Sequence, residues 1–347
     1  MKSQAALVQR EGVKRCWDGN IYGLRKIGQG GTAFVFDIDE TAVVKVPIGF
    51  PASISAFERE REVYHILAEA KNESPYVLKC FQAELRSGLV LERCQGSVRD
   101  ELLRMHMEVP HKFGDAEATE RAIRWSFQAA SGLGFLHSRG IIQADVGCHN
   151  MLLDERDNLK ISDFSGSVIE RTGEDALVSY SVHSQLPGVS KADRRTDIFA
   201  LGSAMYEMAT GRVPLEDLSP SQVRRRFKQA QWPDMTRLKD TYVEFALVIE
   251  GCWNLEFRNV NKAAARIELA YYDSVELGFK PPISNQDLTE ESWTASQSKG
   301  RPKQKPSQKQ ESDRKKAGKH HRKRHGTQSQ KLPKVARGVV SWFHNFR

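Results

Sequence analysis

The sequence predicts an α+β fold in which strands come first along the chain and helices follow. Three patterns predict this fold. Short apolar runs bounded by turn residues occur at 21–27, 41–46 and 88–92, which is typical of strands. Apolar residues recur at spacings of three and four over 120–139, as one face of a helix requires. Residues 197–210 are apolar on most sides of a helix, which indicates a buried one.

The first part of the chain is expected to form strands at 21–27 and 41–46, with a glycine-rich turn after the first of them. A helix is predicted over 53–70, because it is entered after Pro51 and Ser53 can cap its first turn. The apolar run 88–92 is expected to be a further strand.

The second part is expected to contain the long helix 120–139, which ends at Arg139 and a capping Gly140. Two apolar runs, 151–153 and 159–161, flank a polar turn and predict an antiparallel hairpin. If Leu153 pairs with Leu159, residues 151 and 161 lie opposite each other.

Composition limits the class of protein. The 347 residues are 39% hydrophobic and 28% charged, which fits a soluble core joined to a polar segment. No window holds eighteen uninterrupted apolar residues, and residues 1–11 lack a secretory signal, so no membrane partner is expected. The five cysteines are widely spaced, which predicts a reducing, intracellular location without a disulfide framework or zinc site.

Charge divides the chain into an acidic body and a basic tail. Residues 299–347 carry 16 Lys and Arg against 2 Asp and Glu, a net charge of +14, whereas 1–298 carry −6. The polar stretch from 284 onward is predicted to be disordered, and 335–347 could be a short docking element. The basic run of the tail could bind nucleic acid. The favoured interpretation of this run is a nuclear-import signal or a solvated tail. The location is therefore predicted to be nuclear or cytoplasmic.

Three features in the first part have both a functional and an ordinary interpretation. The segment 28–35, which contains Gly28 and Gly30, could let backbone N–H groups approach phosphate, but alone it favours a hairpin turn. Lys45 lies between valines and could be a solvent-facing edge residue. The alternating charges of 57–63 usually mark a solvated helix face.

The strongest signal lies at 141–166. In the predicted hairpin, Asn150 and Asp163 come one step beyond the paired residues and lie near each other, and Asp145 is a short loop away. Side-by-side oxygen ligands are what a Mg²⁺–nucleotide site needs. The alternative is that these are three polar loop residues that cap turns.

The order and spacing of these motifs resemble the eukaryotic protein kinase family over residues 21–275. The resemblance implies a bilobal fold with a small β-rich N-lobe and a larger helical C-lobe, preceded by an extension at 1–20 and followed by the tail at 276–347. Residues 197–202, 206–211 and 252–253 resemble motifs of the C-lobe. The residues around Asp145 and Ser165 also resemble those of a group of fungal kinase-like proteins.

The resemblance implies ATP and Mg²⁺ as cofactors and a protein hydroxyl, expected to be Ser or Thr, as acceptor. Asp145 matches the residue that accepts the substrate proton, and Asn150 and Asp163 match the metal ligands. Lys45 matches the lysine on the α/β-phosphates, with Glu60, rather than Glu58 or Glu62, as its partner. The implied nucleotide contacts are Gly28, Gly30, Val35, Lys45, Glu60, Glu92 and Cys94.

Departures from the family pattern bear on activity. Gln143 and Ala144 replace the His-Arg pair, which removes the usual receptor for an activation-loop phosphate. Gly147 replaces a loop lysine, a loss expected to cost about 10²–10³ in rate. His149 lies where tyrosine kinases place an arginine and could substitute for part of that charge, and Ser165 replaces the last glycine of Asp-Phe-Gly.

Two further departures concern the C-lobe. Leu186–Gly188 is the nearest candidate for Ala-Pro-Glu, and Arg258 is the candidate for a structural arginine. The favoured interpretation is a protein kinase, active or weakly active. The alternatives are a pseudokinase scaffold that binds nucleotide or partners without turnover, a small-molecule phosphotransferase, which 196–218 argue against, and a protein whose tail carries the function.

Overall fold

The computed structural model describes residues 8–10, 13–15, 17–70, 72–84, 87–108, 116–172 and 181–275. All of them belong to one of two units of the chain, residues 1–281 with 339–347, and the second unit is 282–338. The predicted basic tail and the docking element at 335–347 therefore lie outside the described residues, as does Cys16.

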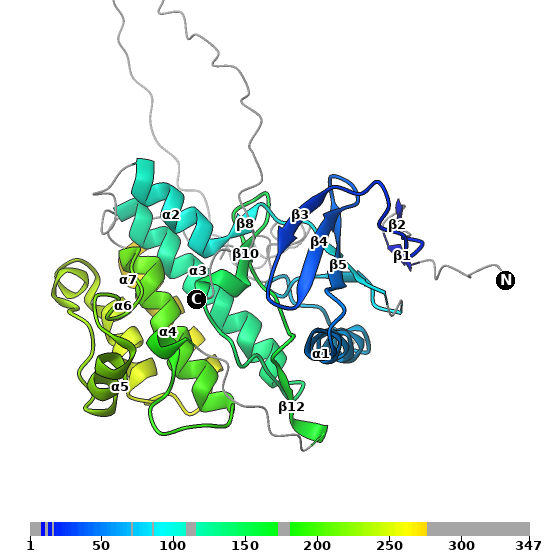
Figure 1. Ribbon diagram of the computed structural model, residues 1–347. Helices are drawn as coiled ribbons and strands as arrows, with labels where there is room; N and C mark the ends of the chain where they lie inside the picture. The colour runs from blue at the N-terminus through cyan, green and yellow to red at the C-terminus, as the bar shows by residue number, and fades with distance from the viewer. Residues whose placement is uncertain are drawn as a thin grey trace, which may run out of the picture. The chain divides into compact units, whose positions relative to one another are not determined.

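The first part of the described chain is a five-stranded antiparallel sheet with a helix beside it (Figure 1). The strand order is β3-β4-β5-β7-β6. The strands are β3 Lys26–Gln29, β4 Ala33–Asp37, β5 Ala42–Pro47, β6 Cys80–Gln82 and β7 Leu89–Glu92, and the helix is α1 Pro51–Ala68. A separate short hairpin is formed by β1 Val8–Arg10 and β2 Val13–Arg15.

Two predictions for this part were wrong in detail. The first strand begins at Lys26 instead of residue 21, because the chain turns there, with Gly23 at a φ of 81° and Leu24 N–H bonded to the Ile21 carbonyl. Ser53 is not the cap of α1. The N-cap is Phe50, and the buried Ser53 hydroxyl donates to the Phe50 carbonyl at 2.7 Å.

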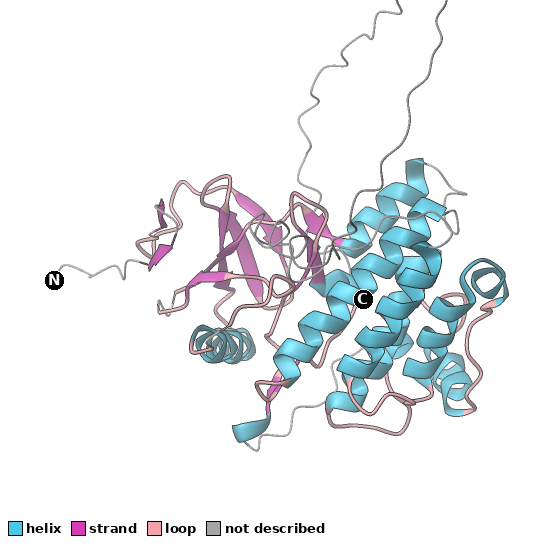
Figure 2. Ribbon diagram, turned by 180° about the vertical axis from the view of Figure 1, so that it is seen from behind, coloured by secondary structure: helices cyan, strands magenta, loops and turns pink. Residues whose placement is uncertain are grey.

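The later part is helical, and its strands are short (Figure 2). Its helices are α2 Val98–Glu108, α3 Ala116–His137, α4 Arg194–Thr210, α5 Pro220–Lys228, α6 Thr236–Trp253 and α7 Val260–Val275. Helix α3 packs against α4 and α7, and α4 packs against α6. The short 3₁₀ helices are Cys148–Asn150, Glu170–Thr172 and Val182–Ser184.

Helix α4 is the buried helix that the sequence predicts. Asp193 caps it by accepting the backbone N–H groups of Arg195 and Thr196, and Gly211 ends it at a φ of 71°. Helix α3 begins four residues earlier than predicted and keeps its apolar face buried, with Ile123, Leu133 and Leu136 fully inaccessible.

The hairpin register predicted around residue 156 is confirmed. Strand β10 Met151–Leu153 pairs with β11 Leu159–Ile161 so that Leu153 lies opposite Leu159 and Met151 opposite Ile161. Strand β8 Gly96–Ser97 pairs with the other edge of β10, and β9 Ile141–Ile142 pairs with β12 Val168–Ile169. These short ladders fix the loops between them, which contain the candidate site.

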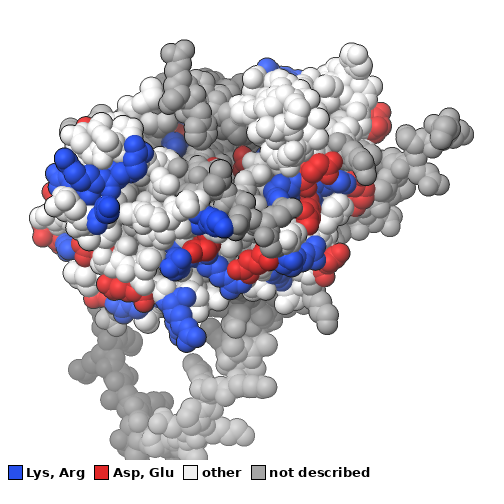
Figure 3. Space-filling model, turned by 60° about the horizontal axis from the view of Figure 1, so that its bottom comes forward, with Lys and Arg blue, Asp and Glu red and all other residues white. Residues whose placement is uncertain are grey.

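Acidic and basic side chains lie close together over much of the face shown in Figure 3. Ion pairs between described residues include Arg194 with Glu170 at 2.6 Å and Arg266 with Glu244 at 2.7 Å. Cysteines 80, 94, 148 and 252 are all free thiols. Among the described helices, none combines the length and the apolar character that crossing a bilayer requires.

Candidate active site

Lys45 points into the interior from the middle of the sheet. It lies on β5 opposite Val35 of β4 and Leu89 of β7, and 8% of its side chain is exposed. Its Nζ lies 2.6 Å from Glu60 Oε2 and 3.0 Å from Asp163 Oδ1. Burial alone lowers the pKa of the Lys45 ammonium, but these two carboxylates raise it above its ordinary value. The interpretation of Lys45 as a solvent-facing edge residue is therefore wrong.

Glu60 is the acidic residue of α1 that faces Lys45, as the resemblance implies. Its side chain is 1% exposed, and burial raises the pKa of its carboxyl although Lys45 lowers it. Glu58 instead pairs with Arg61 near the helix surface. The side chains of 57–63 thus include one buried carboxylate within a charged sequence, which the usual interpretation of a solvated face does not cover.

Asp163 follows β11 and adopts a positive φ of 55°. Its Oδ1 accepts hydrogen bonds from Lys45 Nζ at 3.0 Å and from the Ser165 backbone N–H at 3.3 Å. Burial alone raises the pKa of the Asp163 carboxyl, but Lys45 and Ser165 bring it below its ordinary value. The carboxylate is therefore held in its charged form, as a metal ligand must be.

Asp145 and Asn150 lie together in the loop between β9 and β10. Asn150 Nδ2 donates to Asp145 Oδ2 at 2.9 Å and to the Asp145 carbonyl at 3.0 Å. His149 Nε2 lies 3.3 Å from the same Oδ2. No described residue donates to Asp145 Oδ1 or to Asn150 Oδ1, so one oxygen of each side chain remains available.

Gln143 joins the Asp145 loop to the Asp163 segment. Its Oε1 accepts the Asp145 backbone N–H at 2.6 Å, while its Nε2 donates to the carbonyls of Ser162 at 3.3 Å and Asp163 at 3.2 Å. The sequence marks Gln143 only as a departure from the family pattern. Its role as a link becomes visible only when both segments are placed.

Asp197 anchors the Asp145 loop through hydrogen bonds to its backbone. It is fully buried at the start of α4, and its carboxylate accepts the backbone N–H groups of Gln143 at 2.9 Å and Ala144 at 3.0 Å. Oδ2 also lies 2.7 Å from His137 Nε2. These bonds hold Ala144 at a φ of 65°. A carboxylate in an otherwise apolar helix was the available signal for this anchor.

Five of the predicted site residues, Val35, Lys45, Glu60, Asn150 and Asp163, line one pocket with about 450 Å³ of space free of protein atoms, open solvent included. The residues that line it are Val35, Val43, Lys45, Glu60, Leu78, Leu91, His149, Asn150, Leu152, Ser162 and Asp163. Asp145 is joined to this lining through Asn150 and His149. The interpretation of Asp145, Asn150 and Asp163 as unrelated turn-capping residues does not fit this convergence.

The other predicted contacts lie outside the lining. Gly28 lies on β3 opposite Val35, and Gly30 lies in the turn between β3 and β4, where its N–H bonds to the Ala33 carbonyl at 2.8 Å. Cys94 is buried after β7, and burial raises the pKa of its thiol. Its backbone N–H makes no hydrogen bond to a described residue. That group is therefore available to a ligand.

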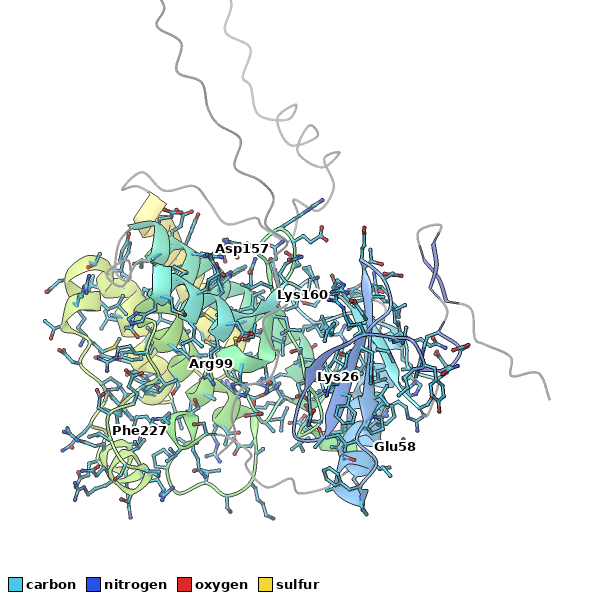
Figure 4. The ribbon with its side chains drawn as sticks, turned by 45° about the horizontal axis from the view of Figure 1, so that its top comes forward. Lys26, Glu58, Arg99, Asp157, Lys160 and Phe227 are labelled. Atoms are coloured by element: carbon cyan, nitrogen blue, oxygen red, sulfur yellow. The ribbon has the colours of Figure 1, made fainter. Side chains whose placement is uncertain are left out.

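Glu92 connects the end of β7 to the hairpin. Lys160 of β11 lies 3.0 Å from Glu92 Oε1, and the Lys79 backbone N–H donates to Oε2 at 3.3 Å. Figure 4 shows Lys160 between the sheet and the helices. The side chain of Glu92 is thus occupied by structural contacts, and its backbone N–H donates to the Lys79 carbonyl at 2.9 Å.

The donor set of the pocket fits Mg²⁺ bound together with phosphate groups. The described residues include no cluster of three His, Cys, Asp or Glu side chains that could hold a metal alone. Asn150 and Asp163 offer two hard oxygen donors, and Mg²⁺ commonly completes its shell with phosphate oxygens and water. Lys45 adds a cation for the remaining phosphate charge.

A family model of the protein kinase domain matches residues 23–259. The chain belongs to the protein kinase family. CBL-interacting protein kinase 28 of Oryza sativa subsp. japonica is 24% identical over 226 residues, which cover 62% of this kinase and 47% of that protein. Serine/threonine-protein kinase PrkC of Bacillus subtilis is 31% identical over 119 residues, 32% of this kinase and 18% of PrkC. This kinase thus spans less than half the length of these relatives.

The bilobal α+β fold predicted from the resemblance is confirmed by this match and by the sheet and helices described above. The likeness to fungal kinase-like proteins stays a prediction. Arg258 is exposed and forms no ion pair with a described residue, so the structural role expected for it is not observed. In the candidate for Ala-Pro-Glu, Leu186 is buried. Gly188, at a φ of 75°, stands where the motif has its glutamate and has no carboxylate to offer.

Proposed function

We propose that this kinase transfers the γ-phosphate of ATP to a serine or threonine hydroxyl of a protein, with Mg²⁺ as the metal. The observation that carries the proposal is the contact of Lys45 with both Glu60 and Asp163 in one pocket. The acceptor class is supported by the names of relatives such as the serine/threonine-protein kinase PrkC.

In this proposal each side chain has one task. Asp145 accepts the proton of the substrate hydroxyl at Oδ1, the oxygen that no described residue occupies. Asn150 and Asp163 hold the metal, which when bound neutralises phosphate charge. Lys45 orients the phosphates while Glu60 keeps its ammonium in place. Val35 lies over the adenine base of ATP. The remaining nucleotide contacts come from Gly28, Gly30 and the backbone of Glu92 and Cys94.

A pseudokinase that binds nucleotide without turnover is the second candidate. The observation that favours it is Gly147, where a phosphate-facing lysine is missing. The basic tail adds a separate proposal, that residues 299–347 address the kinase to the nucleus or bind nucleic acid. Deleting 299–347 should then abolish nuclear accumulation, and an unchanged distribution would contradict the import signal.

The decisive experiment measures radiolabelled phosphate transfer to generic protein substrates and binding of Mg²⁺-ATP to the same preparations. We expect wild type to transfer phosphate, and Asp145→Asn to lose transfer while its melting temperature still rises with Mg²⁺-ATP. Asp163→Ala should lose both. A wild type that is stabilised by nucleotide but never transfers phosphate would establish the pseudokinase, and no stabilisation at millimolar nucleotide would contradict both candidates.

A further inference from the structure

The imidazole of His149 occupies the space beside Gly147 in the Asp145 loop. A Cβ atom placed on Gly147 would lie 2.6 Å from His149 Cε1 and 2.7 Å from Nδ1, distances that real Cβ atoms do not tolerate. The backbone of Gly147 is extended, with a φ of −176°, which any residue can adopt. Glycine at 147 therefore leaves the room that the imidazole occupies, and it is not needed for its backbone conformation.

The residues around His149 are fixed, which leaves the imidazole as the part that could move. Cys148 is fully buried, and its Sγ lies 3.5 Å from the Ala204 carbonyl of α4. Asn150 is buried and holds Asp145, and its backbone N–H bonds to the Gly147 carbonyl at 3.0 Å. A side chain at 147 would thus displace the ring and leave the backbone in place.

Among the described residues, the His149 ring makes one polar contact, and its partner is Asp145. His149 Nε2 lies 3.3 Å from Asp145 Oδ2, the oxygen that also accepts from Asn150. An ionised carboxylate can only accept, so Nε2 must bear the proton. Nδ1 is buried and has no partner among the described residues. Two donors on Oδ2 fix the rotation of the carboxylate, and no described residue donates to Oδ1.

We propose that His149, seated in the space left by Gly147, is a positioning residue that directs Asp145 Oδ1 toward the substrate hydroxyl. This inference rests on the proposed function, because it assigns Asp145 as the proton acceptor. It makes Gly147 and His149 a coupled pair. Gly147 leaves the room in which the imidazole can reach Asp145. The imidazole then gives Asp145 Oδ2 a second hydrogen-bond donor beside Asn150.

The test uses the full chain and compares kcat, KM for ATP and melting temperature among matched variants. His149→Phe keeps a ring over Gly147 but removes the donor, and we expect it to lower kcat about 10–100-fold, as mispositioning does. KM for ATP and the melting temperature should stay close to those of wild type. His149→Gln, which can still donate, should keep most of kcat.

Gly147→Ala should lower kcat as much as His149→Phe does, because the new methyl group displaces the ring. In a His149→Ala background the same Gly147→Ala change should have no further effect on kcat. ¹⁵N spectra of wild type should show the Nε2-protonated tautomer of His149. A wild-type kcat in His149→Phe, an equal Gly147→Ala loss in both backgrounds, or an Nδ1-protonated tautomer would overturn the proposal. If wild type itself transfers no phosphate, the proposed function fails first and this role of His149 fails with it.

Discussion

The side-chain amide of Gln143 donates to the backbone carbonyl of Asp163 at 3.2 Å while its oxygen accepts the Asp145 N–H at 2.6 Å. The segment with the proposed proton acceptor and the segment with a proposed metal ligand are therefore joined by one side chain. The relative position of Asp145 and Asp163 depends on an amide that can donate and accept at the same time.

Gln143→Leu removes all three hydrogen bonds of this side chain, including the one to the Ser162 carbonyl, while keeping its volume. We expect phosphate transfer to fall about 10²-fold, because a misplacement of about 1 Å costs that much. The control is Gln128→Leu, which removes another buried amide, one that holds Asn158 and the Leu159 N–H. It should lower the melting temperature but leave kcat unchanged. Equal losses of kcat in the two variants would show that Gln143 acts only through stability.

Lys45→Met leaves two carboxylates without their shared cation. Because Glu60 is 1% exposed, we expect a loss of about 3 kcal/mol in the free energy of unfolding, as measured in urea. The double variant Lys45→Met/Glu60→Leu should regain part of that loss, since the uncompensated buried charge is gone. Both variants should lack transfer. A double variant less stable than Lys45→Met would contradict the claim that the isolated Glu60 charge is the main cost.

Arg99 of α2 and Glu207 of α4 form a two-bond ion pair of unequal exposure. The distances are 2.6 and 2.8 Å, and 38% of the Arg99 side chain but only 7% of the Glu207 side chain is exposed. Figure 4 shows Arg99 among the helices. Arg99→Met should cost about 2–3 kcal/mol, because Glu207 stays buried and unpaired. Glu207→Gln should cost about 1 kcal/mol, because Arg99 can turn to water.

These two costs are measured by urea unfolding at neutral pH. The order of the two values is the prediction, more than their size. A larger loss in Glu207→Gln would mean that the Arg99 guanidinium cannot reach solvent when its partner is removed.

Glu101 of α2 pairs with Arg104 of the same helix at 2.7 Å and links α2 to α3 through Arg121 at 2.9 Å. Burial alone raises the pKa of the Glu101 carboxyl, but the two arginines bring it below its ordinary value of 4.5. Since the folded-state pKa is the lower one, this stabilisation is complete above pH 4.5 and is lost as the pH falls through the folded-state value.

Glu101→Gln should therefore lower the free energy of unfolding by about 1 kcal/mol at pH 7. The difference from wild type should shrink as the pH is lowered toward 3. Denaturant titrations at several pH values measure it, and Glu244→Gln, an exposed partner of Arg266, is the control. A constant difference from pH 7 to pH 3 would contradict the role of the Glu101 charge.

Much of this fold could be predicted because the apolar pattern of short segments determines which strands pair and which helices are buried. The hairpin register followed from the pattern of apolar residues on each side of the 154–158 turn, and α4 followed from its continuous apolar character. The start of β3 could not be predicted, because residues 21–25 have the composition of a strand but are held in a turn. The residue type of Ser53 suits a cap, but Pro51 is the first residue of α1 and Phe50 is its N-cap.

The candidate site was predictable where a charge had to be buried. The choice of Glu60 over its neighbours depended on the family pattern, and its burial supports that choice. Asp197 had a signal in the sequence, since a carboxylate in a buried helix needs a partner, but its backbone partners were not predictable. Gln143 and the Gly147–His149 contact were not predictable either, because each acts on a backbone group or an empty volume. Spacing along the chain indicates which side chains are present in a loop, but not which of them carry the loop's own hydrogen bonds.

The missing Cβ of Gly147 also restricts how this loop can change over time. A Cβ at 147 would overlap the imidazole at 149, so the residue types at the two positions depend on each other. Once residue 149 is no longer histidine, the space beside 147 can be filled with no further loss of activity. In related chains we therefore expect a larger residue at 147 to occur together with a residue other than histidine at 149.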